Sequence, residues 1–164
     1  MLDYGIDHPG KWGRTFKIIF VNFQEILSRL PYSEPFLFVD SIEYLDENSV
    51  IGHYCFPEKA YYYKGHFKNK PITPGVLLTE CMAQIGVVCL GINLLGIKND
   101  ETPAIAMTST EIDFFLAVQP GETVKVVSHK LYFRFNKLKC KVEMYNRDEN
   151  LIARGNISGM LKDN

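Results

Sequence analysis

The feature that most constrains the fold is a long apolar run, Val76–Leu95, which contains no proline. Its length would suffice to cross a bilayer, but Glu80, Gln84 and Asn93 lie within it and no basic flank anchors it. A helix that is apolar on nearly every side is also typical of the buried centre of a globular fold. The strands predicted on both sides of this run favour the buried helix.

The predicted strands determine how such a helix can be covered. In residues 137–145, apolar side chains alternate with lysine and glutamate, the period of two that is typical of a half-buried strand. Because no other element remains to cover the helix, the strands must form an antiparallel sheet that curls around it. The sequence therefore predicts an α+β fold with one long central helix. The predicted strands cover residues 35–45, 49–56, 104–118, 122–135, 137–145 and 151–161.

The 164 residues fit one domain, without an internal repeat or a flexible linker. We expect an N-terminal extension of unknown role over residues 1–22 and the folded domain over residues 23–164. The domain would begin with a short helix over residues 23–30, capped by Asn22 and ended by Pro31.

Charge and motifs exclude several classes of function. The net charge of −1 gives no reason to expect nucleic acid or an anionic membrane as a partner. The four cysteines form no CxxC pair and the four histidines lack the close spacing of a metal site, so we expect no metal. No signal peptide is apparent, which favours a cytoplasmic protein with reduced cysteines. Motifs of serine hydrolases, dinucleotide sites and P-loops are also missing, which leaves acid–base chemistry without a cofactor, or no chemistry.

Three residues could supply such chemistry within a short stretch. Glu80 is a carboxylate in an apolar helix, which requires pairing, neutralisation or a wet cavity, unless this end of the helix simply reaches solvent. His66 lies in a loop and could equally be an exposed histidine. Gly75 begins the helix, where free N–H groups could stabilise negative charge. A glycine after Pro74 could equally mark only the start of the helix.

Several blocks of the sequence resemble FabZ-type β-hydroxyacyl-acyl carrier protein dehydratases. "ILSRLP…PFLFVD" is similar to the family's "LLPHRYPFLLVD", and "FFLAVQPGETV" is similar to its strand–turn–strand. The resemblance covers about residues 23–162. The signature blocks are "GHF" at 65–67, "P" at 71, "PGV" at 74–76, "E" at 80 and "MAQ" at 82–84.

The resemblance implies a hot-dog fold and a role in fatty acid biosynthesis. It implies a homodimer, with possible assembly into a hexamer, and an active site that takes its histidine from one subunit and its glutamate from the other. The substrate would be an acyl chain on the phosphopantetheine arm of acyl carrier protein, held in an apolar tunnel. His66 would remove the α-proton, Glu80 would protonate the departing hydroxyl and the Gly75 N–H would bind the thioester carbonyl.

The sequence departs from the family pattern in two places. "HFPGNP" reads "HFKNKP", with Lys68 and Asn69 in the loop, and "HRYP" reads "YSEP" at residues 32–35. Since acyl carrier proteins are acidic, Lys64, Lys68 and Lys70 are candidates for docking, or else belong to a solvated loop.

The sequence predicts a β-hydroxyacyl-acyl carrier protein dehydratase of fatty acid biosynthesis. Three alternatives stay open: a dehydratase of a specialised polyketide or polyene pathway, which the altered loops would suit, a hot-dog acyl thioesterase and a non-catalytic acyl-binding subunit. Tyr61, Tyr62 and Tyr63 could line the tunnel or be strand residues that pack on the helix.

Overall fold

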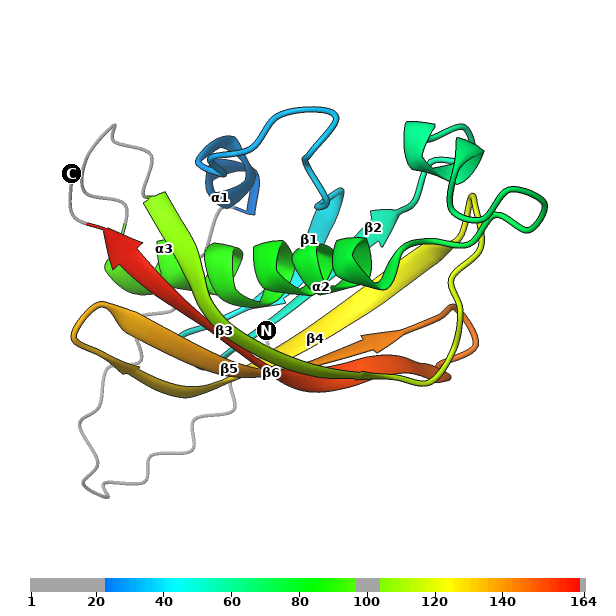
Figure 1. Ribbon diagram of the computed structural model, residues 1–164. Coiled ribbons are helices and arrows are strands. Elements are labelled where there is room, and N and C mark those ends of the chain that lie inside the picture. The colour runs from blue at the N-terminus through cyan, green and yellow to red at the C-terminus, as the bar shows by residue number, and fades with distance from the viewer. Residues whose placement is uncertain (1–22, 97–103, 163–164) are drawn as a thin grey trace, which may run out of the picture.

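A computed structural model describes residues 23–96 and 104–162, and it has the predicted long helix at its centre. The helix lies on the concave side of a curved sheet (Figure 1). It runs as α2, then a π-helical stretch, then α3, with bounds Gly75–Ala83, Gln84–Cys89 and Leu90–Leu95. A short helix, α1, covers Phe23–Ser28.

Within the described residues the sheet has six strands, all paired antiparallel, in the order β1-β2-β4-β5-β6-β3. β3 is therefore an edge strand, and it lies beside the C-terminal strand β6. This arrangement is the hot-dog fold, so the predicted fold class is confirmed. The strands are β1 (Ser41–Leu45), β2 (Ser49–Cys55), β3 (Ala104–Phe114), β4 (Thr123–Arg134), β5 (Lys137–Tyr145) and β6 (Leu151–Lys162).

The central helix is a core helix. It is long and apolar enough to cross a membrane, but every residue from Cys81 to Ile92 is buried inside the protein. The alternating apolar side chains of β5 are buried against it, as the period of two predicted. All four cysteines are free, and three of them are buried.

The central helix packs closely against the sheet in its π-helical stretch. Gly86 lies there without a side chain, and a Cβ added to it would come 2.9 Å from Val142 Cγ1 and 3.0 Å from Ser128 Cβ. In a π-helical turn the backbone hydrogen bonds join residues five positions apart, instead of four as in an α-helix. The buried Ser128 hydroxyl donates a hydrogen bond of 2.9 Å to the Gly86 carbonyl and so joins helix to sheet.

Several predicted boundaries were wrong. The segment 35–40 is a loop rather than the start of β1, because it bonds to the central helix: the Phe38 N–H donates to Gln84 Oε1. Tyr61–Lys64 forms a 3-10 helix, so the strand interpretation of the three tyrosines is incorrect. β3 ends at Phe114 rather than at residue 118. The predicted extension over residues 1–22, with the Asn22 cap, lies outside the described residues.

The close packing at Gly86 gives a stability prediction. Alanine favours a helix over glycine by up to about 1 kcal/mol, but a methyl group here would displace Ser128 and Val142. We expect Gly86→Ala to lower the free energy of unfolding by about 1–2 kcal/mol, as overpacking does. Urea denaturation at fixed protein concentration measures this change.

Gly65→Ala is the matched control, because a Cβ at Gly65 would meet no atom within 4 Å. This variant should stay within about 0.5 kcal/mol of the wild type. A Gly86→Ala protein that is more stable than the wild type would contradict the packing argument.

Candidate functional site

His66 is held in one tautomer by the loop that carries it. Its Nδ1 lies 3.0 Å from the Ile72 carbonyl oxygen. A carbonyl oxygen can only accept a hydrogen bond, so Nδ1 carries the proton and Nε2 is left as the basic nitrogen. The loop is closed by the bond from the Ile72 N–H to the His66 carbonyl and by the bond from the Thr73 N–H to the Val118 carbonyl. The half-buried imidazole is thus fixed in orientation, and Nε2 is the ring nitrogen that this hydrogen bond leaves unused.

Gly75 begins the central helix beside this histidine. Its first-turn N–H has no acceptor within the helix, as for every residue at a helix start. The ring of Phe114 lies over it, since a Cβ at Gly75 would come 3.3 Å from Phe114 Cζ. Both residues line an open cavity of about 320 Å³ together with His66, Phe67 and residues 115–117 at the end of β3. The structure therefore brings the predicted base and the predicted N–H donor into one cavity.

Glu80 is half-buried and does not simply extend into solvent. Its Oε1 accepts a 2.9 Å hydrogen bond from the Nε2 of Gln84, one helical turn further along. Gln84 is completely buried, and the same nitrogen also donates to the Phe36 carbonyl. Since its Oε1 accepts from the Phe38 N–H, the amide of Gln84 is fully engaged in fixing both Glu80 and the loop before β1.

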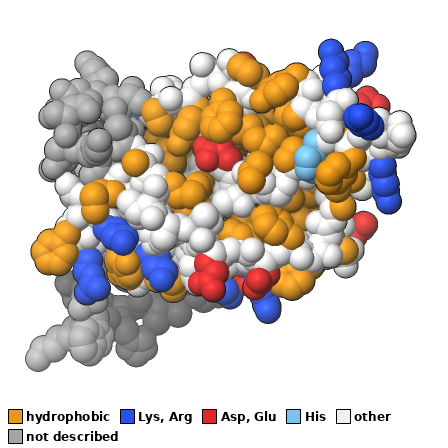
Figure 2. Space-filling model, viewed as in Figure 1, with side chains coloured by type: hydrophobic (Ala, Val, Ile, Leu, Met, Phe, Trp, Pro, Cys, Tyr) orange, Lys and Arg blue, Asp and Glu red, His pale blue; other side chains and the backbone are white. Residues whose placement is uncertain are grey.

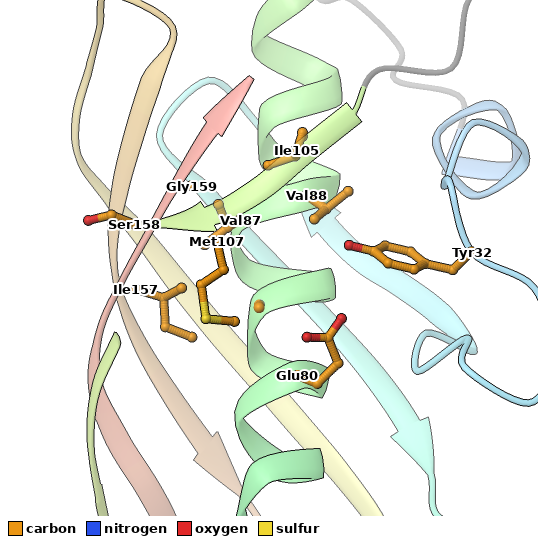
Figure 3. Close-up of a pocket in the computed structure, with 10 residues that line it drawn as sticks. Tyr32, Glu80, Val87, Val88, Ile105, Met107, Ile157, Ser158 and Gly159 are labelled. Carbon is orange, nitrogen blue, oxygen red and sulfur yellow. The ribbon is translucent and has the colours of Figure 1, made fainter. Parts of the chain in front are cut away.

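Glu80 lines a second cavity, of about 190 Å³, which shares no lining residue with the cavity of His66. Figure 3 shows the Glu80 carboxylate and the ring of Tyr32 beside the central helix, with Met107 and Ile105 of β3 opposite. The rest of the wall is mostly apolar. Among these cavities, which are lined by residues 23–96 and 104–162 of one chain, neither has both His66 and Glu80 in its wall.

The face that carries both cavities is largely hydrophobic. Figure 2 shows apolar side chains spread over this face, with an acidic side chain among them and a histidine toward one end. Val76 is 76% exposed, and Phe114, Phe115 and Leu116 are each close to half exposed. Exposed apolar side chains that gather on one face indicate an interaction site, whereas singly scattered ones do not.

The predicted docking lysines lie at the His66 end of the molecule. Lys64, Lys68 and Lys70 are all exposed, and so is Asn69. Lys64 ends the 3-10 helix just before His66, and Lys68 and Lys70 lie in the exposed segment that follows it.

Two residues at the site were not predicted to have a role in it. The spacing of Gln84 from Glu80, four positions along a helix, places the two side chains on one face and could have indicated their contact. Tyr32 was noted only as a departure from the family motif. Its approach to Glu80 depends on the fold of the loop before β1, which carries no local sequence signal.

Known proteins resemble the chain in sequence and in fold. A family model for the FabA-like domain matches residues 30–156. The 3-hydroxyacyl-acyl-carrier-protein dehydratase FabZ of Ehrlichia canis (strain Jake) is 33% identical over 148 residues, which cover 87% of this chain and 97% of that protein.

Solved structures share the fold at low sequence identity. The dehydratase heterocomplex ApeI:P from Xenorhabdus doucetiae superposes with a TM-score of 0.69 at 11% identity, over 84% of this chain and 91% of that one. A hypothetical thioesterase of Streptococcus pneumoniae TIGR4, solved with coenzyme A, gives a TM-score of 0.54 at 12% identity, over 74% and 84% of the two chains. Because dehydratases and thioesterases share this fold, the fold does not identify the family of this chain. The sequence matches identify it. By its match over most of both sequences, the chain belongs to the FabZ-type 3-hydroxyacyl-acyl-carrier-protein dehydratases of the FabA-like family.

Proposed function

We propose that the protein removes water from a 3-hydroxyacyl group carried on acyl carrier protein and releases the trans-2-enoyl thioester, as a cytoplasmic enzyme of fatty acid biosynthesis. The observation that carries this proposal is the state of His66, whose Nδ1–H is bound to the Ile72 carbonyl while Nε2 is left basic. Such an imidazole can remove a proton without a metal or a cofactor.

The chemistry divides among three residues. Nε2 of His66 takes the proton from the α-carbon of the substrate, and the electron pair moves toward the thioester carbonyl. The Gly75 N–H donates a hydrogen bond to that carbonyl oxygen and stabilises its developing charge. The protonated carboxyl group of Glu80 then gives its proton to the hydroxyl at the β-carbon, the C–O bond breaks, and water leaves as the double bond forms and Glu80 becomes a carboxylate.

This division requires two copies of the chain, because His66 and Glu80 line different cavities. The edge strand β3 supports such an arrangement. Residues 106–111 of β3 are all exposed, so an open edge runs along the hydrophobic face, and open edges favour pairing with another strand.

The two cavities lie at opposite ends of β3: Ile105 and Met107 line the cavity of Glu80, and Phe114 lines that of His66. An antiparallel pairing of two β3 strands, centred on the middle of the strand, would bring each Glu80 cavity beside the partner's His66 cavity. We therefore propose a homodimer with two shared sites. A hexamer built from three such dimers is compatible with this arrangement.

The other functions make different demands on the same residues. A thioesterase would use Glu80 to activate water at the carbonyl carbon, and a non-catalytic subunit would need neither Glu80 nor the oriented imidazole. A dehydratase of a polyketide or polyene pathway would share the chemistry and differ in its substrate.

We also propose that Lys64, Lys68 and Lys70, which lie close to His66 in the sequence, attract the acidic carrier protein.

The proposed reaction can be tested with a 3-hydroxyacyl carrier substrate while enoyl product and free thiol are followed together. We expect enoyl product from the wild type, and a loss of at least about 10²-fold in turnover for His66→Ala and for Glu80→Gln, the usual effect of removing an acid or a base. His129→Ala is the matched control, because His129 is exposed on β4 and bonds to Ser49. Release of thiol without enoyl product would instead indicate a thioesterase, and neither product a binding subunit.

The shared site can be tested by mixing inactive variants. When His66→Ala and Glu80→Gln chains are unfolded and refolded together, random pairing leaves about one quarter of the sites with both wild-type residues. We expect activity to return to about a quarter of the wild-type value. A mixture of two preparations of His66→Ala is the control, and it should stay inactive. If both residues of a site came from one chain, the mixed variants would recover no activity.

A further inference from the structure

Tyr32 comes from the loop between α1 and β1 and faces the cavity that Glu80 lines (Figure 3). The loop is fixed in place by the buried amide of Gln84, which bonds to the backbone of Phe36 and of Phe38. The same amide bonds to the Glu80 carboxylate. The phenol and the carboxylate are therefore held relative to each other by one buried side chain.

The Tyr32 hydroxyl can donate a hydrogen bond in this position, because it keeps its proton. Burial, and secondly the charge of Glu80, raise the pKa of Tyr32 to about 12, so the hydroxyl keeps its proton near neutral pH. Within residues 23–96 and 104–162, no hydrogen bond engages this hydroxyl. A phenol hydroxyl in partly apolar surroundings is stabilised when it finds a hydrogen-bond partner.

The cavity indicates which group could accept a hydrogen bond from the Tyr32 hydroxyl. Its walls are formed by apolar side chains of the helix and of β3, among them Val87, Val88 and Met107. Its volume of about 190 Å³ has room for the end of a substrate as well as for water. Among the described residues that line this wall, Tyr32 and Glu80 carry the ionisable groups, and Figure 3 shows both directed into the space beside the helix.

We propose that Tyr32 donates a hydrogen bond from its hydroxyl to the oxygen on the substrate's β-carbon and positions this oxygen for protonation by Glu80. Tyr32 keeps its own proton throughout, so the proton that leaves in the water still comes from Glu80. The inference rests on the proposed dehydration, because that reaction puts an oxygen beside Glu80. Tyr32 is a positioning residue that takes the place of the histidine in the family's "HRYP" motif.

The test compares Tyr32→Phe with the wild type in steady-state dehydration. The ring, and with it the wall of the cavity, is retained, so KM should stay within about twofold while kcat falls about tenfold, as expected for one lost hydrogen bond. Tyr32→His restores an N–H donor at this position and should recover most of the lost kcat. Tyr44→Phe is the matched control: it removes an exposed hydroxyl that bonds to Asp46 and should leave both parameters unchanged.

The outcomes separate this inference from the proposed function. A Tyr32→Phe protein with the wild-type kcat would overturn the role of Tyr32 and leave the dehydration intact. A Tyr32→His protein no more active than Tyr32→Phe would show that a hydrogen-bond donor at this position does not restore kcat, and it would also overturn the role of Tyr32. A folded wild-type protein that forms no enoyl product would overturn the proposed function, and the inference with it.

Discussion

One sheet has to bury one long apolar helix, and it can cover only part of the helix surface. The π-helical stretch packs against β2, β4, β5 and β6, where Gly86 allows the helix to approach the sheet closely. The remaining strip of the helix lies between the α1–β1 loop and β3, and this strip carries Glu80. The incomplete cover therefore leaves a partly apolar cavity with one carboxylate in it. In such surroundings a carboxylate interacts more strongly with a substrate than it would in water.

The polar contacts around this strip fix the site before any substrate arrives. Gln84 is an amide in the core, and a buried amide is tolerated only when its hydrogen-bonding groups are satisfied. Its partners are the two functional segments themselves, the Glu80 side chain and the loop that carries Tyr32. At the other end of β3, the Ile72 carbonyl fixes the tautomer of His66. The same interactions thus stabilise the fold and orient the groups that we assign to catalysis.

The sequence was sufficient to predict the central helix, most strand centres and the candidate residues. The helix followed from its length without proline, and β5 from its alternation, because both patterns are local. The apolar run Phe36–Val39 predicts a strand at 35–40, but this segment is a loop because its backbone bonds to Gln84, which is distant in the sequence. The π-helical stretch and the separation of His66 from Glu80 into two cavities also depend on packing between distant segments. The family resemblance predicts a site between subunits, and the exposed edge of β3 supports the homodimer that we propose.

The central claim is that one active site takes its base from one chain and its acid from another. A crystal structure of the Glu80→Gln protein with a 3-hydroxyacyl thioester bound would test it most directly. The account predicts two β3 strands paired antiparallel, with the substrate's α-carbon facing His66 Nε2 of one chain and its β-oxygen within about 3 Å of residue 80 of the other. A substrate held between His66 and residue 80 of the same chain, with the β3 edges apart, would contradict it.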